Sequence, residues 1–306
     1  MLIIDRRFTN EMQKREFITE CENDFLRMME SLTSSILENG DMRVVTLSGP
    51  TCSGKTVTAE RISRAVEKAG RRMIRISIDD YYRDRSELIA EAEREGRAPD
   101  YDSAGSIDLR FLEKNIDGIC NKAKVDLPRY DFKTGSRSDV VTVDSSKYDL
   151  VLFEGIQAVY PEVTSMFGHY PYVSIATDVR SGICTNGRSF DAREVRLMRR
   201  LVRDVHARNT PPERTFKLWA TTVIPNEEKN ILPYSGTADI KIDSLMPYEI
   251  HVIRDPLIET LSRVPKDDEY YLTAEDLIRR VTPIEPIDRK YIPCDSLYRE
   301  FIGDGN

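Results

Sequence analysis

The sequence is poor in several residues that define other classes of protein. Its 306 residues include one tryptophan, three histidines and five cysteines, and no two cysteines form a Cys-x-x-Cys pair. An odd number of scattered cysteines argues against a disulfide framework or a zinc site and favours a reducing compartment. The histidines lack the spacing of metal ligands, and we interpret them as ordinary structural or surface residues: His169, His206 and His251.

Long apolar runs are also missing. No stretch approaches the about 20 apolar residues that a membrane-spanning helix needs. The first charge comes at the fifth residue, too early for the apolar core of a signal peptide. The net charge of −7 argues against general nucleic-acid binding, which favours a basic face. We therefore expect a cytoplasmic protein whose partners include no membrane and no nucleic acid, and the sequence leaves homo-oligomer formation open.

Short apolar segments alternate with amphipathic segments through the middle of the chain. Strands are expected at 44–47, 74–78, 140–143, 150–153 and 172–176, and helices at 86–96, 108–122 and 191–208. Strands that alternate with helices imply βαβ units and a mostly parallel sheet with helices on both faces. The sequence therefore predicts an α/β fold.

Segments with a different pattern flank this central part. In residues 1–40 an apolar stripe at helical spacing predicts a helix that packs on the protein's own core; it consists of Ile18, Cys21, Phe25, Met28 and Leu32. An α/β domain is expected at 41–245. Residues 246–306 are expected to form a C-terminal extension that packs on this domain, with a helix at 273–281 opened by the capping box Thr273-x-x-Asp276.

One segment matches the phosphate-binding pattern G-x-x-x-x-G-K-[ST] in full: Gly49-Pro50-Thr51-Cys52-Ser53-Gly54-Lys55-Thr56. It stands between an expected strand and an expected helix, as this mechanism requires. Its backbone N–H groups and the start of the helix attract phosphate oxygens. We expect Lys55 to neutralise the β- and γ-phosphates and the Thr56 hydroxyl to bind Mg²⁺. A purely structural glycine turn would not explain a Lys-Thr pair at these offsets.

Carboxylates follow two of the expected strands. Asp79 and Asp80 close the second strand, and Glu154 closes the apolar strand 150–153. These acids are candidates for organising a metal ion and the attacking group, although strand-end acids are also often simply solvated. Asp79 fits a general base that accepts a hydroxyl proton or orients the hydroxyl. A GTPase would need Asn-Lys-x-Asp, but the chain has lysine at the last position of that pattern, in "NKAK" at 121–124.

The expected helix at 191–208 is rich in arginine. Residues 180–208 carry eight arginines and three acidic residues, a net charge of +5 in a chain of −7. Four of the arginines fall within about 100° around the helix axis: Arg196, Arg199, Arg200 and Arg203. A solvated helix face is the simpler interpretation. The opposite sign of the local charge favours a lid that closes on transferring phosphates.

Taken in order, several blocks resemble the uridine kinase branch of the phosphoribulokinase/uridine kinase family. They run from about Val44 to Ile242 and are "GPTCSGKT", "SIDDYY", "YDSAGSID", "LPRYDFKTGSR", "VLFEGI", "RLMRRLVRD" and "TADIKI". The resemblance implies a P-loop NTPase-type kinase that uses ATP and Mg²⁺ to phosphorylate a hydroxyl. In uridine kinases this hydroxyl is the nucleoside 5′-OH.

The resemblance also implies roles for individual residues. Asp79 falls on the catalytic base, and the Mg²⁺ environment falls on Thr56, Asp79 and Glu154. Asp102 corresponds to the carboxylate that holds the ribose hydroxyls, and Tyr130 to an aromatic residue of the nucleoside pocket. Arg200 and Arg203 correspond to arginines of the substrate and phosphate clamp.

Besides the long stretch "TDVRSGICTNGRSFDAREVR", which replaces the usual short Asp-x-Asp link into the arginine helix, two positions depart from the family pattern. Gly135 stands where uridine kinases carry a histidine against the pyrimidine, and Arg208-Asn209-Thr210 replaces an Arg-Gly-Arg sequence. Space beside Gly135 for a larger group is a hypothesis that follows from the first departure. The sequence thus predicts a kinase for a nucleoside-like molecule. A kinase for a sugar, a sugar phosphate or a vitamin-like alcohol, and a nucleotide-binding regulatory protein without turnover, are the alternatives.

Overall fold

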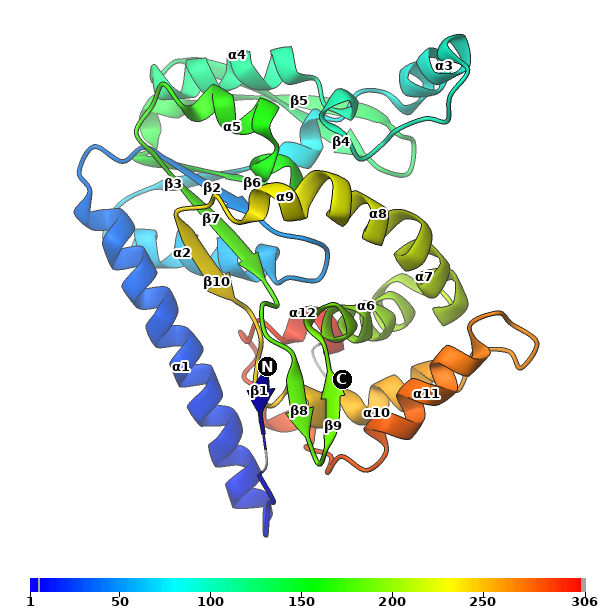
Figure 1. Cartoon of the computed structure of the whole chain (residues 1–306). Coiled ribbons are helices and arrows are strands. Elements are labelled where there is room, and N and C mark those ends of the chain that lie inside the picture. Colours follow the sequence, from blue (N-terminus) through cyan, green and yellow to red (C-terminus); the bar gives the residue numbers. More distant parts are fainter. Residues whose placement is uncertain (5, 304–306) are drawn as a thin grey trace.

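The computed structural model describes residues 1–4 and 6–303. At its centre lies a five-stranded, fully parallel sheet in the order β10-β7-β2-β6-β3 (Figure 1). The strands are β2 (Val44–Ser48), β3 (Met73–Ser77), β6 (Leu150–Glu154), β7 (Tyr172–Asp178) and β10 (Ile240–Asp243). This arrangement confirms the predicted α/β fold with a mostly parallel sheet.

The central sheet is buried on both faces. Side chains alternate along a strand: Val45 and Leu47 of β2 enter one apolar core, and Val44 enters the other. The first core includes α2 (Lys55–Lys68), and the second includes α4 (Leu109–Cys120) and α5 (Pro161–Phe167). Burial on both faces explains why the central strands are continuously apolar.

The N-terminal helix α1 (Glu11–Glu38) packs on the first of these cores. Its buried side chains include Ile18, Cys21, Phe25 and Leu32, as the apolar stripe predicts, whereas Met29 rather than Met28 is fully buried. Figure 1 shows α1 running alongside α2 and β10. Within the described residues, no helix is long and apolar enough to cross a membrane.

Two small β structures stand outside the central sheet. β4 (Lys124–Asp131) and β5 (Ser136–Asp144) form an antiparallel hairpin, longer than the short strand expected at 140–143. β8 (Ile183–Thr185) and β9 (Arg188–Phe190) form a second hairpin, and β8 also pairs in parallel with β1 (Leu2–Ile3). The connection between β7 and the arginine-rich helix therefore pairs with the N-terminal strand of the chain.

Helices connect the last two strands of the central sheet. α6 (Ala192–Arg208) coincides with the expected arginine-rich helix. A helical arm, Pro212–Ser235, follows and contains α7 (Pro212–Leu218), α8 (Ile224–Asn226) and α9 (Leu232–Ser235), joined by two wider helical turns. The arm leads back to β10 along the carboxyl edge of the sheet (Figure 1).

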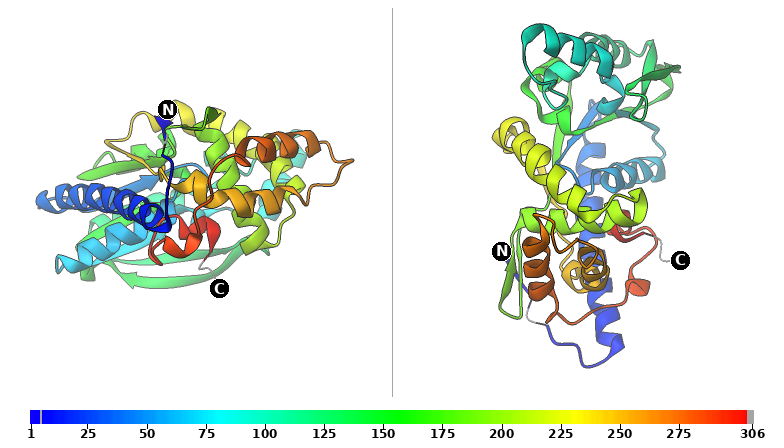
Figure 2. Two further views of the ribbon diagram at one scale, coloured as in Figure 1. Left: turned by 90° about the horizontal axis from the view of Figure 1, so that it is seen from below. Right: turned by 90° about the vertical axis from the view of Figure 1, so that its right-hand side faces the viewer.

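The C-terminal part of the chain packs below this edge (Figure 2). It comprises α10 (Glu249–Leu261), α11 (Tyr271–Val281) and α12 (Arg299–Ile302). The predicted capping box at Thr273 is wrong, since α11 already begins at Tyr271. The turn at Asp268, whose side chain accepts the Tyr270 N–H, starts the helix two residues earlier.

Candidate active site

The phosphate-binding pattern forms a loop directly after β2, in the middle of the sheet. Gly54 has φ +80°, the left-handed conformation that favours glycine, and α2 begins at the next residue. A Cβ on Gly49 would lie 2.2 Å from the backbone oxygen of Thr177 in β7, so only glycine fits there. The loop therefore places backbone N–H groups and a helix N-terminus at one point, which is suited to phosphate.

Lys55 and Thr56 stand in the first turn of α2. The Lys55 ammonium donates to the carbonyl oxygens of Gly49 (2.7 Å) and Pro50 (3.0 Å), and burial lowers its pKa. The charges of Asp79 and Glu154 oppose that shift. Thr56 is exposed beside Lys55. The structure thus brings the predicted lysine to the same place as the two predicted carboxylates.

Asp79 and Glu154 lie at the ends of neighbouring strands. Asp79 follows β3 in a single 3₁₀ turn, Ile78–Tyr81, and Glu154 is the last residue of β6. Burial raises the pKa of both carboxyl groups, and the charge of Asp79 raises that of Glu154 further. A buried carboxyl group whose ionisation is opposed by a neighbouring carboxylate is suited to a cation nearby. Among the described residues no cluster of three His, Cys, Asp or Glu side chains forms a metal site.

Gln157 connects Asp79 with the aromatic side of the site. Its amide nitrogen donates to Asp79 Oδ1 (2.9 Å) and to the Tyr82 hydroxyl (2.8 Å). Tyr82 in turn packs against Tyr130, with ring centroids 5.6 Å apart, and Phe132 lies 5.1 Å from Tyr130. No pattern in the sequence indicated Gln157 or Tyr82, although both lie within three residues of predicted site residues. The three rings and Asp79 border one region.

Asp102 lies close to this aromatic group. Burial and the charge of Asp100 raise the pKa of Asp102, and the backbone oxygen of Asp102 accepts a bond of 2.7 Å from the Tyr160 hydroxyl. The charges of both Asp79 and Asp102 act on Tyr82 and Tyr160. Asp102, Tyr130 and Asp79 are thus neighbours, although they are separated by up to 51 residues in the printed sequence.

The space beside Gly135 is not open. Gly135 has φ +71°, and a Cβ there would lie 2.9 Å from three atoms of Arg85, at the start of α3 (Arg85–Glu95). The Arg85 N–H donates to the Gly135 oxygen (2.8 Å), and its guanidinium donates to the Phe132 oxygen (3.1 Å). The hypothesis of an enlarged space at this position is therefore wrong. The space is filled by the Arg85 guanidinium group, which lies beside the aromatic rings.

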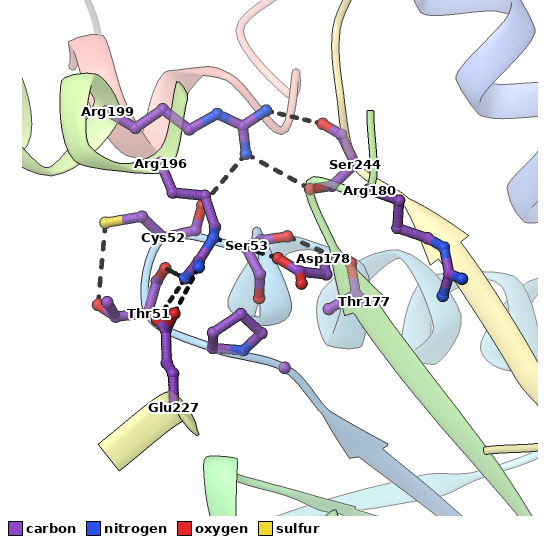
Figure 3. Close-up of polar contacts among 12 residues, drawn as sticks. Thr51, Cys52, Ser53, Thr177, Asp178, Arg180, Arg196, Arg199, Glu227 and Ser244 are labelled. Carbon is purple, nitrogen blue, oxygen red and sulfur yellow. Dashed lines mark hydrogen bonds and ion pairs between the residues drawn. The ribbon is translucent and has the colours of Figure 1, made fainter. Parts of the chain in front are cut away.

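The arginines of α6 do not form a solvated face. Arg196 makes two bonds of 2.6 Å with Glu227 of the helical arm (Figure 3). Arg199 binds Glu249 of α10 at 2.6 and 2.8 Å. These acidic partners lie 31 and 50 residues away, so the local charge count could not include them. Their burial excludes the simple interpretation as a solvated face.

The two arginines expected to act on substrate have a different partner. Arg200 and Arg203 both bind Asp204, at 3.2 and 2.9 Å. The charge of Arg203 also acts on Cys52 of the phosphate-binding loop. The charge of Arg200 acts on Cys52 as well, so both arginines lie near the loop although they bind Asp204 of their own helix. Their function as a clamp on substrate stays a prediction.

Comparison with known proteins agrees with this geometry. The model of the "Phosphoribulokinase / Uridine kinase family" matches residues 44–250. A uridine kinase of Ureaplasma parvum is 28% identical over 199 residues, 65% of this chain and 86% of the relative. A uridine kinase of Halobacterium salinarum is 30% identical over 198 residues, 64% of this chain and 77% of the relative.

A solved structure shows the same fold. It is described as a fructose transport system kinase of Silicibacter sp. TM1040, with a TM-score of 0.51 and 16% sequence identity. The match covers 70% of this chain and 98% of the other. Segments 1–43 and 251–306 lie outside the region that the family model matches.

Proposed function

The chain belongs to the phosphoribulokinase/uridine kinase family and is a small-molecule kinase, and we propose that it transfers the γ-phosphate of ATP to a hydroxyl of a nucleoside-like acceptor. The observation that carries this proposal is the position of Asp79. Its carboxylate lies in the field of Lys55 on one side and is bound to Gln157, next to the aromatic rings, on the other.

The residues around Asp79 have different functions in phosphoryl transfer. The loop amides and Lys55 bind the phosphates of the donor and stabilise the negative charge that develops on the transferring group. Asp79 orients the acceptor hydroxyl or accepts its proton. Gln157 donates to Asp79 and thereby fixes the direction of its carboxylate.

Mg²⁺ fits the same place. Thr56, Asp79 and Glu154 would hold it, together with phosphate oxygens, because Mg²⁺ binds few protein ligands in nucleotide sites. The raised pKa of Glu154, caused by burial and by the charge of Asp79, supports a cation between these carboxylates. When bound, the ion supplies positive charge to the phosphates.

The acceptor side supports a molecule with a ring and a diol. Tyr130 offers an aromatic face, and Asp102 offers a carboxylate for sugar hydroxyls. Relatives named uridine kinases support a nucleoside. A sugar phosphate is a second candidate, favoured by one observation: the Arg85 guanidinium beside the aromatic rings would bind an anionic acceptor well.

A screen for acceptor-dependent ADP release over nucleosides, sugars, sugar phosphates and vitamins tests the proposal. We expect at least one acceptor to stimulate ADP release in the presence of Mg²⁺, and Asp79→Asn to lower kcat by about 10²–10⁴-fold while ATP binding is kept. Asp117→Asn, a matched change at a carboxylate that binds only the Tyr170 hydroxyl among the described residues, serves as the control. ATP binding without any acceptor-dependent turnover would instead favour a regulatory nucleotide-binding protein.

A further inference from the structure

The phosphate-binding loop is held from its outer side. Arg199 donates to the carbonyl oxygen of Cys52 (3.1 Å), and Arg196 donates to that of Thr51 (3.3 Å) (Figure 3). A peptide group whose oxygen is bound on one side directs its N–H toward the other. Contacts on the carbonyl side therefore help to fix the direction of the N–H groups that face phosphate.

Arg199 is fixed on several sides. It is fully buried, binds both carboxylate oxygens of Glu249, and donates to the backbone oxygen of Ser244 (2.8 Å). Aromatic rings cover its guanidinium: the ring of Phe301 lies 4.8 Å away and that of Tyr298 lies 5.8 Å away. Both aromatic residues belong to Ser296–Ile302, which we call the C-terminal segment.

The C-terminal segment also contacts the loop directly. Leu297 is fully buried, and its Cδ1 lies 2.6 Å from the point where a Cβ on Gly54 would stand. The segment is anchored at its start, since the Ser296 hydroxyl donates to the buried carboxylate of Glu22 in α1. Just before it, the backbone oxygen of Asp295 accepts a bond of 2.6 Å from Arg61 in α2.

The conformation of the loop needs such support. Cys52 has φ +59° and Gly54 has φ +80°. A non-glycine residue in the left-handed region carries a conformational cost and persists only when its surroundings hold it. Cys52 is 3% exposed, its carbonyl oxygen is bound by Arg199 of α6, and the charge of Glu300 in the C-terminal segment acts on its thiol.

We infer that the C-terminal segment is part of the donor site, where it positions the phosphate-binding loop through Leu297 against Gly54 and through Phe301 against Arg199. The inference rests on the proposed function in that the loop binds a nucleoside triphosphate. It assigns a function to a part of the chain that lies outside the region matched by the family model. Leu297, Phe301 and Arg199 are positioning residues, because they act on the loop and do not touch the phosphates.

Leu297→Ala tests the inference, with Leu277→Ala as the matched control. Both leucines are buried, and Leu277 lies on α11, away from the loop. Two quantities are measured in folded protein, as judged by circular dichroism: the Kd of ATP, and the rate at which a thiol reagent labels Cys52, located by mass spectrometry. We expect Leu297→Ala to raise the Kd of ATP about tenfold or more and to speed Cys52 labelling by a similar factor. ATP should slow this labelling again.

Leu277→Ala should leave both quantities within about twofold of the unmodified protein, although it removes the same atoms from a buried site. Equal effects of the two substitutions would overturn the inference, because a general loss of stability would then explain them. Tighter ATP binding by Leu297→Ala would also overturn it and would show that the segment obstructs the loop.

The two readouts separate this inference from the proposed function. If the unmodified protein binds no ATP, the proposed function fails, while the labelling of Cys52 still reports whether Leu297 holds the loop. Phe301→Leu provides a second variant should Leu297→Ala fail to fold. It removes the aromatic face from Arg199 and keeps an apolar side chain. If Cys52 is labelled in Phe301→Leu at the same rate as in the unmodified protein, Phe301 does not position the loop through Arg199.

Discussion

Arg85 fills the space that a side chain on Gly135 would need, and the two residues also share a backbone hydrogen bond of 2.8 Å. In the sequence, Gly135 indicates only that the side chain present in uridine kinases is missing at this position. In the structure the same volume holds a guanidinium group that comes from α3, 50 residues earlier in the chain. This point of the proposed acceptor site is therefore cationic.

Arg85→Ala is expected to act on the acceptor and not on the donor. It removes the guanidinium beside Tyr130 and Phe132, so the KM of the acceptor should rise about tenfold, or more for an anionic acceptor. The KM of ATP should stay within about twofold. Steady-state kinetics with each substrate varied in turn provide the measurement.

Arg94→Ala on the same helix is the control for Arg85→Ala, because its guanidinium binds only the Ala90 carbonyl of its own helix among the described residues. An unchanged acceptor KM in Arg85→Ala would remove Arg85 from the acceptor site. The second candidate acceptor, a sugar phosphate, would lose its structural support at the same time.

The pH dependence of the reaction should reflect the burial of Asp79. Burial raises the pKa of this carboxyl group, and the hydrogen bond from Gln157 lowers it in part. Since the ionised form acts as the base, kcat/KM should fall as the pH falls through the pKa of Asp79. Gln157→Leu removes the lowering contribution, so the acid limb of the profile should move to still higher pH.

The pH profile of Gln157→Leu is measured at saturating ATP and Mg²⁺, with circular dichroism at each pH to exclude acid unfolding. An acid limb that stays in place, or that moves to lower pH, would show that Gln157 does not act on the group that titrates. A simple loss of kcat at all pH values would mean that Gln157 only orients Asp79.

Local patterns were sufficient to predict which residues meet in one half of the candidate site. The loop 49–56 and the carboxylates Asp79 and Glu154 stand at the carboxyl ends of strands in the sequence. In a parallel sheet these ends meet at one edge. The structure brings these residues together around Lys55. Each part is encoded within a few consecutive residues, so no tertiary contact had to be known.

Features that depend on distant partners could not be predicted. The acidic partners of Arg196 and Arg199 come from the helical arm and from α10, and Arg85, the first residue of α3, lies against Gly135. The β8–β9 hairpin needs β1 to complete its sheet. Such contacts depend on how elements pack, and neither residue of a pair indicates the other in the sequence.

Gly49 should tolerate no side chain at all. A Cβ there would lie 2.2 Å from the backbone oxygen of Thr177, and backbone of the central sheet cannot move aside without distorting β7. Gly49→Ala should therefore raise the Kd of ATP by about 10²-fold or more, or unfold the domain. In Gly40→Ala, the control, nothing lies within 4 Å of the new Cβ, so ATP binding should be unchanged. Calorimetric titration with ATP measures the Kd of both variants. Equal Kd values would contradict the close approach of β7 to the loop.

The pair Arg196–Glu227 should join α6 to the helical arm in the folded protein. Both side chains are buried, and Glu227→Gln leaves the Arg196 charge with only Asp178, at 3.3 Å, as an acidic partner. Breaking a buried ion pair from one side costs about 3–5 kcal/mol, so the free energy of unfolding from urea denaturation should fall by an amount of this order. Glu228→Gln, next in the chain, breaks only the exposed pair with Arg193 and should hardly change the unfolding midpoint. If Glu227→Gln is as stable as Glu228→Gln, the arm is free to leave α6 at little cost. A lid that opens between these elements would then agree better with the data than a fixed support of the loop.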